Sequence, residues 1–260
     1  MAKGASPSGL FDLTGQVALV TGSTQGIGLA LAEGLARNGA AVALNGRNAA
    51  QVERTVDDFK NRGACVVGMP FDVTDKNQAL SQIGRIEQDL GPITILVNNA
   101  GISRRGPFDE QSDEDWTSVL TTNVDGVRNV SAPILQSMAR RNRGKIINVC
   151  SLSSERARPE IAAYAATKGA LKMLTRALAV EFARHNIQIN GLAPGYIKTA
   201  LNSSLASDAE FDRWVVGRTP AGRWGSPEDL VGTALFLASG ASDFVTGQII
   251  YVDGGILAAL

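Results

Sequence analysis

The sequence is poor in the residues that build metal clusters, disulfide frameworks and charged binding faces. Its 260 residues include one histidine, His185, and two cysteines, Cys65 and Cys150, far apart in the chain. This supply predicts neither a zinc cluster nor a disulfide framework. Basic and acidic side chains number 25 each, so the electrostatic footprint of a nucleic-acid-binding protein is missing. We expect the partners to be small molecules or other protein chains, with no nucleic acid among them.

Long apolar runs are missing as well. No run approaches the roughly 18 apolar residues of a membrane span, and the first nine residues lack the apolar centre of a signal peptide. The sequence therefore predicts a cytoplasmic protein with no membrane partner. Residues 1–9 are rich in Gly, Ser and Ala, and we expect them to form a flexible N-terminal arm.

The chain does contain a regular series of short apolar segments. They do not alternate with polar residues, which is typical of strands covered on both faces in a parallel sheet. The segments span residues 17–21, 41–44, 64–68, 93–97, 145–149, 187–190 and 248–252. Helical patterns fill the gaps, with Asn48 and Thr74 as the expected N-caps of the second and third helices. This alternation predicts an α/β fold, a doubly wound parallel sheet with helices on both faces, as a single domain over residues 10–260.

Residues 194–222 break this rhythm. They are rich in Ser and Asn, have weak periodicity and are longer than an ordinary α/β connection. We interpret them as a segment that covers the substrate, and a solvated surface insertion is the alternative.

A glycine-rich turn follows the first apolar segment and opens a helix. It comprises Gly22, Ser23, Thr24, Gln25, Gly26, Ile27 and Gly28. Glycines are needed where backbone turns tightly or approaches a phosphate, and the amides at a helix N-terminus donate to that phosphate. The spacing Gly-x-x-x-Gly-x-Gly differs from the dinucleotide fingerprint Gly-x-Gly-x-x-Gly. We predict a phosphate-binding turn, and a glycine-rich turn without a ligand is the alternative.

The end of the second apolar segment indicates which dinucleotide to expect. An acid there would bind a ribose 2′-hydroxyl, whereas a basic residue suits a 2′-phosphate. The chain has Asn45 and Arg47 here and no acid, and the planar guanidinium favours NADP over NAD. A solvated surface arginine is the alternative. Further cofactor candidates at neighbouring strand ends are Asp72, Val73, Asn99, Ala100 and Gly101.

Tyr164 and Lys168 lie four residues apart in a helical pattern, so their side chains share one face. A free phenol titrates near pH ~10, but a cation within ~4 to 6 Å can lower a neighbouring acid's pKa by ~1 to 3 units. Lys168 would therefore let Tyr164 act as acid or base. Ser151, which follows the fifth apolar segment, could hydrogen-bond a substrate oxygen, and a helix or turn cap is its alternative role.

Taken together, these motifs resemble the short-chain dehydrogenase/reductase family over essentially the whole chain. The match depends on the joint occurrence, in order, of residues 21–28, residues 98–101, Asn123, Ser151, Tyr164, Lys168 and Pro194-Gly195. The resemblance implies a Rossmann-type domain in which hydride moves directly between nicotinamide and substrate. Tyr164 would be the acid/base, Lys168 would bind the nicotinamide ribose, Ser151 would orient the reacting oxygen and Asn123 would support a proton relay. The resemblance also implies a homotetramer and cofactor contacts from Pro194, Gly195, Ile197 and Thr199.

Within that family, the chain is similar to members that interconvert a sugar acid and its keto acid. Arg104 or Arg105 could then pair with the substrate carboxylate, with Arg104 as our choice, and Glu155 could accept its hydroxyl donors. Exposed charges on loops are the alternative reading of all three. The alternative enzyme is a 3-oxoacyl carrier-protein reductase or another ketone reductase. A nucleotide-sensing scaffold without catalysis would normally lack Tyr164 or Lys168, and both are present.

Overall fold

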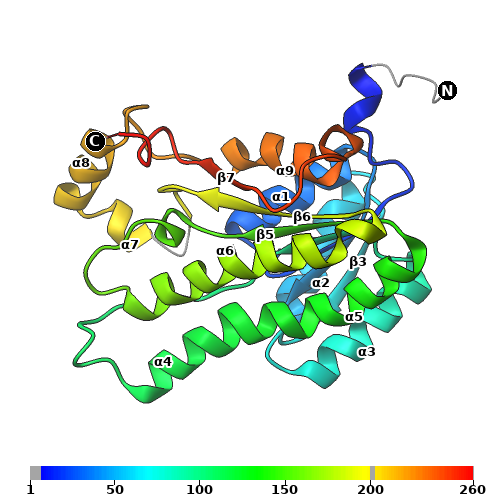
Figure 1. Ribbon diagram of the computed structural model, residues 1–260, viewed down its shortest axis with the longest axis horizontal. Coiled ribbons are helices and arrows are strands. Elements are labelled where there is room, and N and C mark those ends of the chain that lie inside the picture. The colour runs from blue at the N-terminus through cyan, green and yellow to red at the C-terminus, as the bar shows by residue number, and fades with distance from the viewer. Residues whose placement is uncertain (1–6, 200–202, 260) are drawn as a thin grey trace.

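Seven parallel strands form the sheet of the computed structural model, which describes residues 7–199 and 203–259 (Figure 1). The strands are β1 (Val17–Val20), β2 (Ala41–Gly46), β3 (Val66–Pro70), β4 (Ile95–Asn98), β5 (Gly144–Val149), β6 (Ile187–Pro194) and β7 (Ile249–Val252). Their order is β3-β2-β1-β4-β5-β6-β7, with every neighbouring pair parallel. This order confirms the predicted doubly wound sheet, and it places a topological switch point between β1 and β4.

Helices cover both faces of the sheet because alternate residues of a strand point to opposite sides. They are α1 (Gly26–Arg37), α2 (Ala49–Asn61), α3 (Lys76–Asp89), α4 (Asp113–Leu120), α5 (Gly126–Arg141), α6 (Ala162–Phe182), α7 (Ser203–Ala206), α8 (Ala209–Arg218) and α9 (Val231–Ala238). The face that buries Val20 packs against α1, α2 and α9, and the face that buries Leu19 packs against α3, α5 and α6. Figure 1 shows α1 and α9 on one side of the sheet and α5 and α6 on the other. Among the helices of the described residues, none is long and apolar enough to span a membrane.

Local side-chain chemistry sets where the helices begin. Asn48 caps α2 as predicted, because its Oδ1 accepts the N–H of Gln51 at 3.0 Å. The predicted cap of α3, Thr74, is wrong by one residue. Asp75 accepts two amides of the first turn of α3, both at 3.0 Å. The Thr74 hydroxyl instead donates to Asp72 at 2.8 Å, and so it does not cap the helix.

The stretches that interrupt the strand and helix rhythm contain short helices of their own. Residues 7–9 of the expected arm belong to a 3₁₀ helix, Pro7–Phe11, and residues 1–6 lie outside the described residues. β6 extends beyond the predicted end at residue 190, because it pairs with β7 as far as Pro194. After β6, α7 and α8 lie beyond the carboxyl ends of the strands (Figure 1). Residues 200–202 of the predicted covering segment lie outside the described residues.

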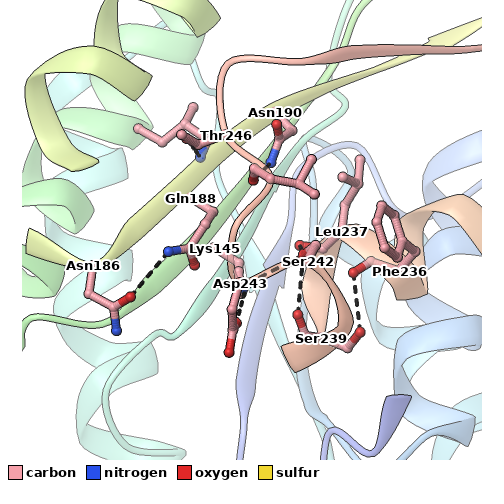
Figure 2. Close-up of polar contacts among 12 residues, drawn as sticks. Lys145, Asn186, Gln188, Asn190, Phe236, Leu237, Ser239, Ser242, Asp243 and Thr246 are labelled. Carbon is pink, nitrogen blue, oxygen red and sulfur yellow. Dashed lines mark hydrogen bonds and ion pairs between the residues drawn. The ribbon is translucent and has the colours of Figure 1, made fainter. Parts of the chain in front are cut away.

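At the amino-terminal end of the sheet, side chains attach the connection between α9 and β7 to β5 and β6 (Figure 2). Nζ of Lys145, near the start of β5, donates to Asp243 at 2.7 Å and to Ser242 at 3.3 Å. The amide of Asn190 in β6 donates to the Val245 carbonyl at 2.7 Å. Burial lowers the pKa of Lys145, and the hydrogen bond to Asp243 opposes that shift. These contacts hold β7 in register beside β6.

The contact between α1 and α9 generates a stability prediction. A Cβ at Gly34 of α1 would lie 2.4 Å from Cγ1 of Val231, whose branched side chain has little freedom to move in a helix. We expect Gly34→Ala to lower the free energy of unfolding by about 1 to 3 kcal/mol, measured by urea denaturation.

The matched control is Gly84→Ala. Gly84 lies on the exposed face of α3, and a Cβ there would meet nothing within 4 Å. We expect this control to be neutral or to stabilise by up to about 1 kcal/mol, because alanine loses less backbone entropy in a helix. Equal stability of the two variants would show that α1 and α9 are not packed as closely as described.

Candidate active site

A cavity of about 1140 Å³ opens where the loops leave the carboxyl ends of the strands. Its wall is formed by loops after β1, β2, β3, β4, β5 and β6 together with the start of α6. Such a position beside the switch between β1 and β4 is where ligands bind in open α/β sheets. The volume exceeds the roughly 300 to 1,000 Å³ of ordinary small-molecule sites. The cavity is therefore large enough for a dinucleotide and a small second ligand.

The turn after β1 brings backbone close to the cavity. Gly22 adopts φ +63°, and a Cβ on Gly28 would lie 2.3 Å from the Gly22 carbonyl oxygen, so neither position tolerates a side chain. α1 begins directly after this turn, and Gln25 at its N-cap makes no side-chain cap. Gly26, Ile27 and Gly28, the first residues of α1, line the cavity, and within the described residues no side-chain cap engages this end of the helix, which is the usual arrangement for binding a phosphate.

Ser23 is the exception among the residues of this turn. It is fully buried and lies outside the cavity wall. Its Oγ accepts the N–H of Asn45 at 2.9 Å, and its own N–H donates to the Asn45 carbonyl at 2.8 Å. Ser23 thus attaches the turn to β2 and does not face a ligand.

Two asparagine side chains hold the turn from opposite sides. Oδ1 of Asn45 accepts the N–H of Gly22 at 3.1 Å, while its Nδ2 donates to two backbone carbonyls at the end of β3, at 3.0 and 3.2 Å. Nδ2 of Asn99, which follows β4, donates to the carbonyls of Thr21 and Gly22 at 3.0 Å each. The Thr21 hydroxyl in turn accepts the amides of Asn99 and Ala100. The loops after β1, β2, β3 and β4 are thereby joined into one rigid wall.

The remaining predicted cofactor residues also lie in this wall. Arg47 is exposed at the end of β2 and forms no ion pair with any carboxylate of residues 7–199 or 203–259. The Asp72 carboxylate accepts from the amide and hydroxyl of Thr74. The other wall residues predicted from the sequence are Thr24, Gln25, Gly26, Ile27, Val73, Ala100, Gly101, Pro194, Gly195, Ile197 and Thr199.

Tyr164 and Lys168 reach the cavity from the first turns of α6. The Lys168 ammonium is buried, donates to the Val149 carbonyl at 2.7 Å and lies 5.6 Å from the centre of the Tyr164 ring. Ser151 faces the same space, and its Oγ accepts the N–H of Ser153 at 3.0 Å, so it also caps the short helix that follows. A hydroxyl that accepts one bond retains its own proton to donate. Ser151 can therefore serve as a cap and as a donor to a ligand oxygen.

Asn123 lies behind the wall and not in it. It belongs to a π-helical turn, Thr121–Asp125, between α4 and α5, a distortion that often marks functional sites. Its Oδ1 accepts the N–H of Ile102 at 2.8 Å, and its Nδ2 donates to the Ile102 carbonyl at 2.9 Å and to Thr167 at 3.1 Å. Asn123 thus binds the loop after β4 to α6, the helix that carries Tyr164.

Three arginines also line the cavity. Arg104 and Arg105 follow β4, and Arg158, which we did not predict from the sequence, comes from the loop before α6. Arg104 is paired with Asp115, with Nε 3.4 Å from Oδ1. Burial and the neighbouring Arg158 charge lower the pKa of Arg105, and burial raises the pKa of Tyr196 beside them. Arg158 lies in the loop that follows β5, and that strand-end placement was the available sequence signal.

Glu155 does not join this group. Its carboxylate accepts from the Lys172 ammonium and from the Tyr251 hydroxyl, the latter at 3.0 Å, and it lies outside the cavity wall. The hydrogen bond from Lys172 lowers the pKa of Glu155. Through these two bonds to Oε1, Glu155 secures the loop after β5 to α6 and β7.

The chain is similar to known proteins over nearly its whole length. The family model described as enoyl-(acyl carrier protein) reductase matches residues 22–257. The gluconate 5-dehydrogenase of Gluconobacter oxydans is 52% identical over 251 residues, covering 96% of this chain and 98% of that protein. The 5-keto-D-gluconate 5-reductase of Escherichia coli is 49% identical over 251 residues, covering 96% and 99%. A crystal structure of a gluconate 5-dehydrogenase from Burkholderia cenocepacia in complex with NADP and tartrate is 49% identical, with a TM-score of 0.96, covering 98% of this chain and 100% of that one.

The hydrogen bonds of Asn45 generate the prediction for this wall. Asn45→Ala leaves the Gly22 amide after β1 and two carbonyls at the end of β3 without their partner. We expect the free energy of unfolding to fall by about 2 kcal/mol or more in urea denaturation. Asn61→Ala, an exposed asparagine in the last turn of α2, is the control and should change stability by less than about 0.5 kcal/mol. Identical unfolding curves for the two variants would contradict the role given to Asn45.

Proposed function

The chain belongs to the short-chain dehydrogenase/reductase family, and on that premise we propose that it interconverts gluconate and 5-ketogluconate with NADP as cofactor. One observation carries the proposal. Tyr164 and Lys168 share a cavity with the uncapped start of α1 and with two arginines, Arg105 and Arg158, that have no carboxylate partner in the described residues. An acid–base group, a phosphate site and an anion site thus meet in one place. The names of the Gluconobacter oxydans and Escherichia coli relatives support this substrate pair.

The residues around β1 and β2 fit a dinucleotide phosphate. The first-turn amides of α1 would hold the pyrophosphate, and the space that Gly22 and Gly28 leave open lets it approach the backbone. The unpaired Arg47 guanidinium is suited to a 2′-phosphate. Bound there, NADP supplies or accepts a hydride through its nicotinamide ring. The NADP-bound relative from Burkholderia cenocepacia supports this choice of cofactor.

The chemistry of this chain's own residues is proton transfer and orientation. In the reductive direction, the Tyr164 hydroxyl gives its proton to the ketone oxygen, and in the oxidative direction it takes the proton back. The Ser151 hydroxyl donates a hydrogen bond to the same oxygen. Lys168 is anchored on the Val149 carbonyl and keeps a positive charge beside the phenol, which stabilises the negative charge left after the proton departs. We propose that Asn123 holds the Ile102 loop and α6 in place for this proton transfer.

The charge of the wall favours a small anionic substrate. Three guanidinium groups, Arg104, Arg105 and Arg158, line the cavity. Because Arg104 already has Asp115 as its partner, we now assign the substrate carboxylate to Arg105 and not to Arg104. Turnover of 5-ketogluconate, compared with a 3-oxoacyl thioester, separates this proposal from the carrier-protein reductase alternative.

We also propose that the chain acts as a homotetramer in the cytoplasm. The outer face of α6 supports assembly, because Met173 and Val180 there are 58% and 83% exposed. Phe108, close to α4, is 69% exposed as well. Apolar side chains gathered on neighbouring helices are typical of a surface that another chain covers.

The proposed chemistry depends on the Tyr164 hydroxyl. The purified protein should oxidise gluconate with NADP and reduce 5-ketogluconate with NADPH in a spectrophotometric assay. Tyr164→Phe keeps the ring and removes only the proton donor, so turnover should fall by about 10²- to 10⁴-fold or more. NADPH binding, followed by fluorescence, should remain near that of the wild type. Turnover close to wild type would overturn the assignment of the acid–base group.

The preference for NADP depends on Arg47. Arg47→Asp replaces a phosphate donor with a repelling carboxylate, so NADP binding should weaken by about 1 to 3 kcal/mol while NAD binding changes far less. Arg54→Asp is the matched control, because Arg54 is exposed on α2 and lies outside the cavity wall. Calorimetric titration of both cofactors measures the effect. An equal loss of the two cofactors in Arg47→Asp would mean that Arg47 does not contact the 2′-phosphate.

A further inference from the structure

Arg158 is held in a defined position by an aromatic ring. It lies half-buried in the loop that leads into α6, and its guanidinium carbon is 5.3 Å from the ring centre of Phe211 in α8. Phe211 itself packs against Tyr196, Trp214 and Trp224, with ring centres 5.6 to 6.1 Å apart. A guanidinium stacked on a ring keeps its N–H donors free at its edges and loses little further freedom when it binds. The stack therefore presents donors that are ordered before any ligand arrives.

Arg105 and Arg158 bring two positive charges to the same wall. Neither side chain forms an ion pair within residues 7–199 and 203–259, whereas Arg104 next to them is paired with Asp115. Burial lowers the pKa of Arg105, and the like charge of Arg158 lowers it further. Glu160 is the carboxylate whose charge acts on Arg105, but it makes no ion pair with it. An anion between two unpaired guanidinium groups would remove this repulsion and form charge-assisted hydrogen bonds with both.

The backbone holds the two arginine loops together. The amide of Gly106, next to Arg105, donates to the carbonyl of Glu160, two residues after Arg158, at 3.2 Å. Glu160 adopts φ +68°, a left-handed conformation that is strained for a residue with a side chain. Strain of this kind persists where surrounding contacts require it, and it concentrates at ligand sites. The backbone segments that carry Arg105 and Arg158 are thus joined directly to each other.

From these contacts we infer that Arg158 is a specificity-determining residue that binds the substrate carboxylate together with Arg105. The inference deepens the proposed function and rests on it for the identity of the substrate. In 5-ketogluconate, three hydroxyl-bearing carbons separate the carboxylate from the ketone. With the carboxylate anchored on Arg105 and Arg158, the ketone is the carbon that meets Tyr164, which lines the same cavity. The arginine pair therefore selects acids and also selects the carbon that reacts.

The first test measures selectivity in steady-state kinetics. Arg158→Gln removes the charge and keeps a polar side chain, so KM for 5-ketogluconate should rise roughly 10- to 100-fold. The specificity constant for an uncharged ketohexose should change by less than about 3-fold, because that substrate has no carboxylate to lose. Arg156→Gln, an exposed arginine of the same loop outside the cavity wall, is the matched control and should behave as the wild type. Arg158→Lys, which keeps the charge, should recover part of the loss.

The second test measures carboxylate binding without turnover. Tartrate is titrated by calorimetry into the NADP-loaded protein, and Arg158→Gln should bind it at least about 10-fold more weakly than wild type and Arg156→Gln do. Equal tartrate affinity, or an equal kinetic loss for the acid and the uncharged ketohexose, overturns the inference. If tartrate binding falls as expected while wild type turns over neither gluconate nor 5-ketogluconate, the proposed function fails and the carboxylate site stands.

Discussion

The side-chain amide groups of Asn45 and Asn99 bind the turn after β1 from two sides, and the rest of the cavity depends on those hydrogen bonds. Each loop at the carboxyl edge of the sheet leaves backbone donors and acceptors that no neighbouring strand can satisfy. Asn45 links the turn to β3, and Asn99 links it to β4. These bonds fix the turn that leads into α1, whose N-cap residue Gln25 makes no side-chain cap. The loops satisfy one another's backbone donors and acceptors, and these bonds hold the walls of the ligand site in place.

Buried polar side chains also fix the position of α6. Asn98, Asn148 and Thr175 form a buried chain of hydrogen bonds from β4 through β5 to α6, with links of 2.9 and 2.8 Å. Polar groups this deep in a core are costly unless they are fully paired, and once paired they define one arrangement of the elements they join. Asn123 adds a further link from α6 to the loop after β4. Tyr164 and Lys168 therefore project from a helix whose position is tied to two strands and a loop.

The proposed carboxylate site lies in the part of the cavity built from loops, with α8 packed behind it. The loops after β4 and β5 each contribute an arginine, and α8 contributes the ring on which Arg158 stacks. In contrast, the wall near α1 is made of short strand-end turns with little room for variation. A scaffold of this kind keeps the phosphate site and the acid–base pair constant while its loops change the second ligand. The polar groups at the amino end of the sheet hold β7 in place and lie away from this chemistry.

Much of this arrangement is determined by the sequence alone, because its signals are local. Strands buried on both faces must be apolar at nearly every position, so the apolar segments predicted the strands of the sheet. The glycines before α1 indicated a phosphate-binding turn, and the Tyr164–Lys168 spacing indicated an acid–base pair. Only the tertiary structure decided which loop side chains face the cavity, since the direction of a loop side chain depends on partners distant in sequence. Thus Ser23 and Glu155 bind protein groups, Arg104 pairs with Asp115, and Arg158 contacts the Phe211 ring of α8.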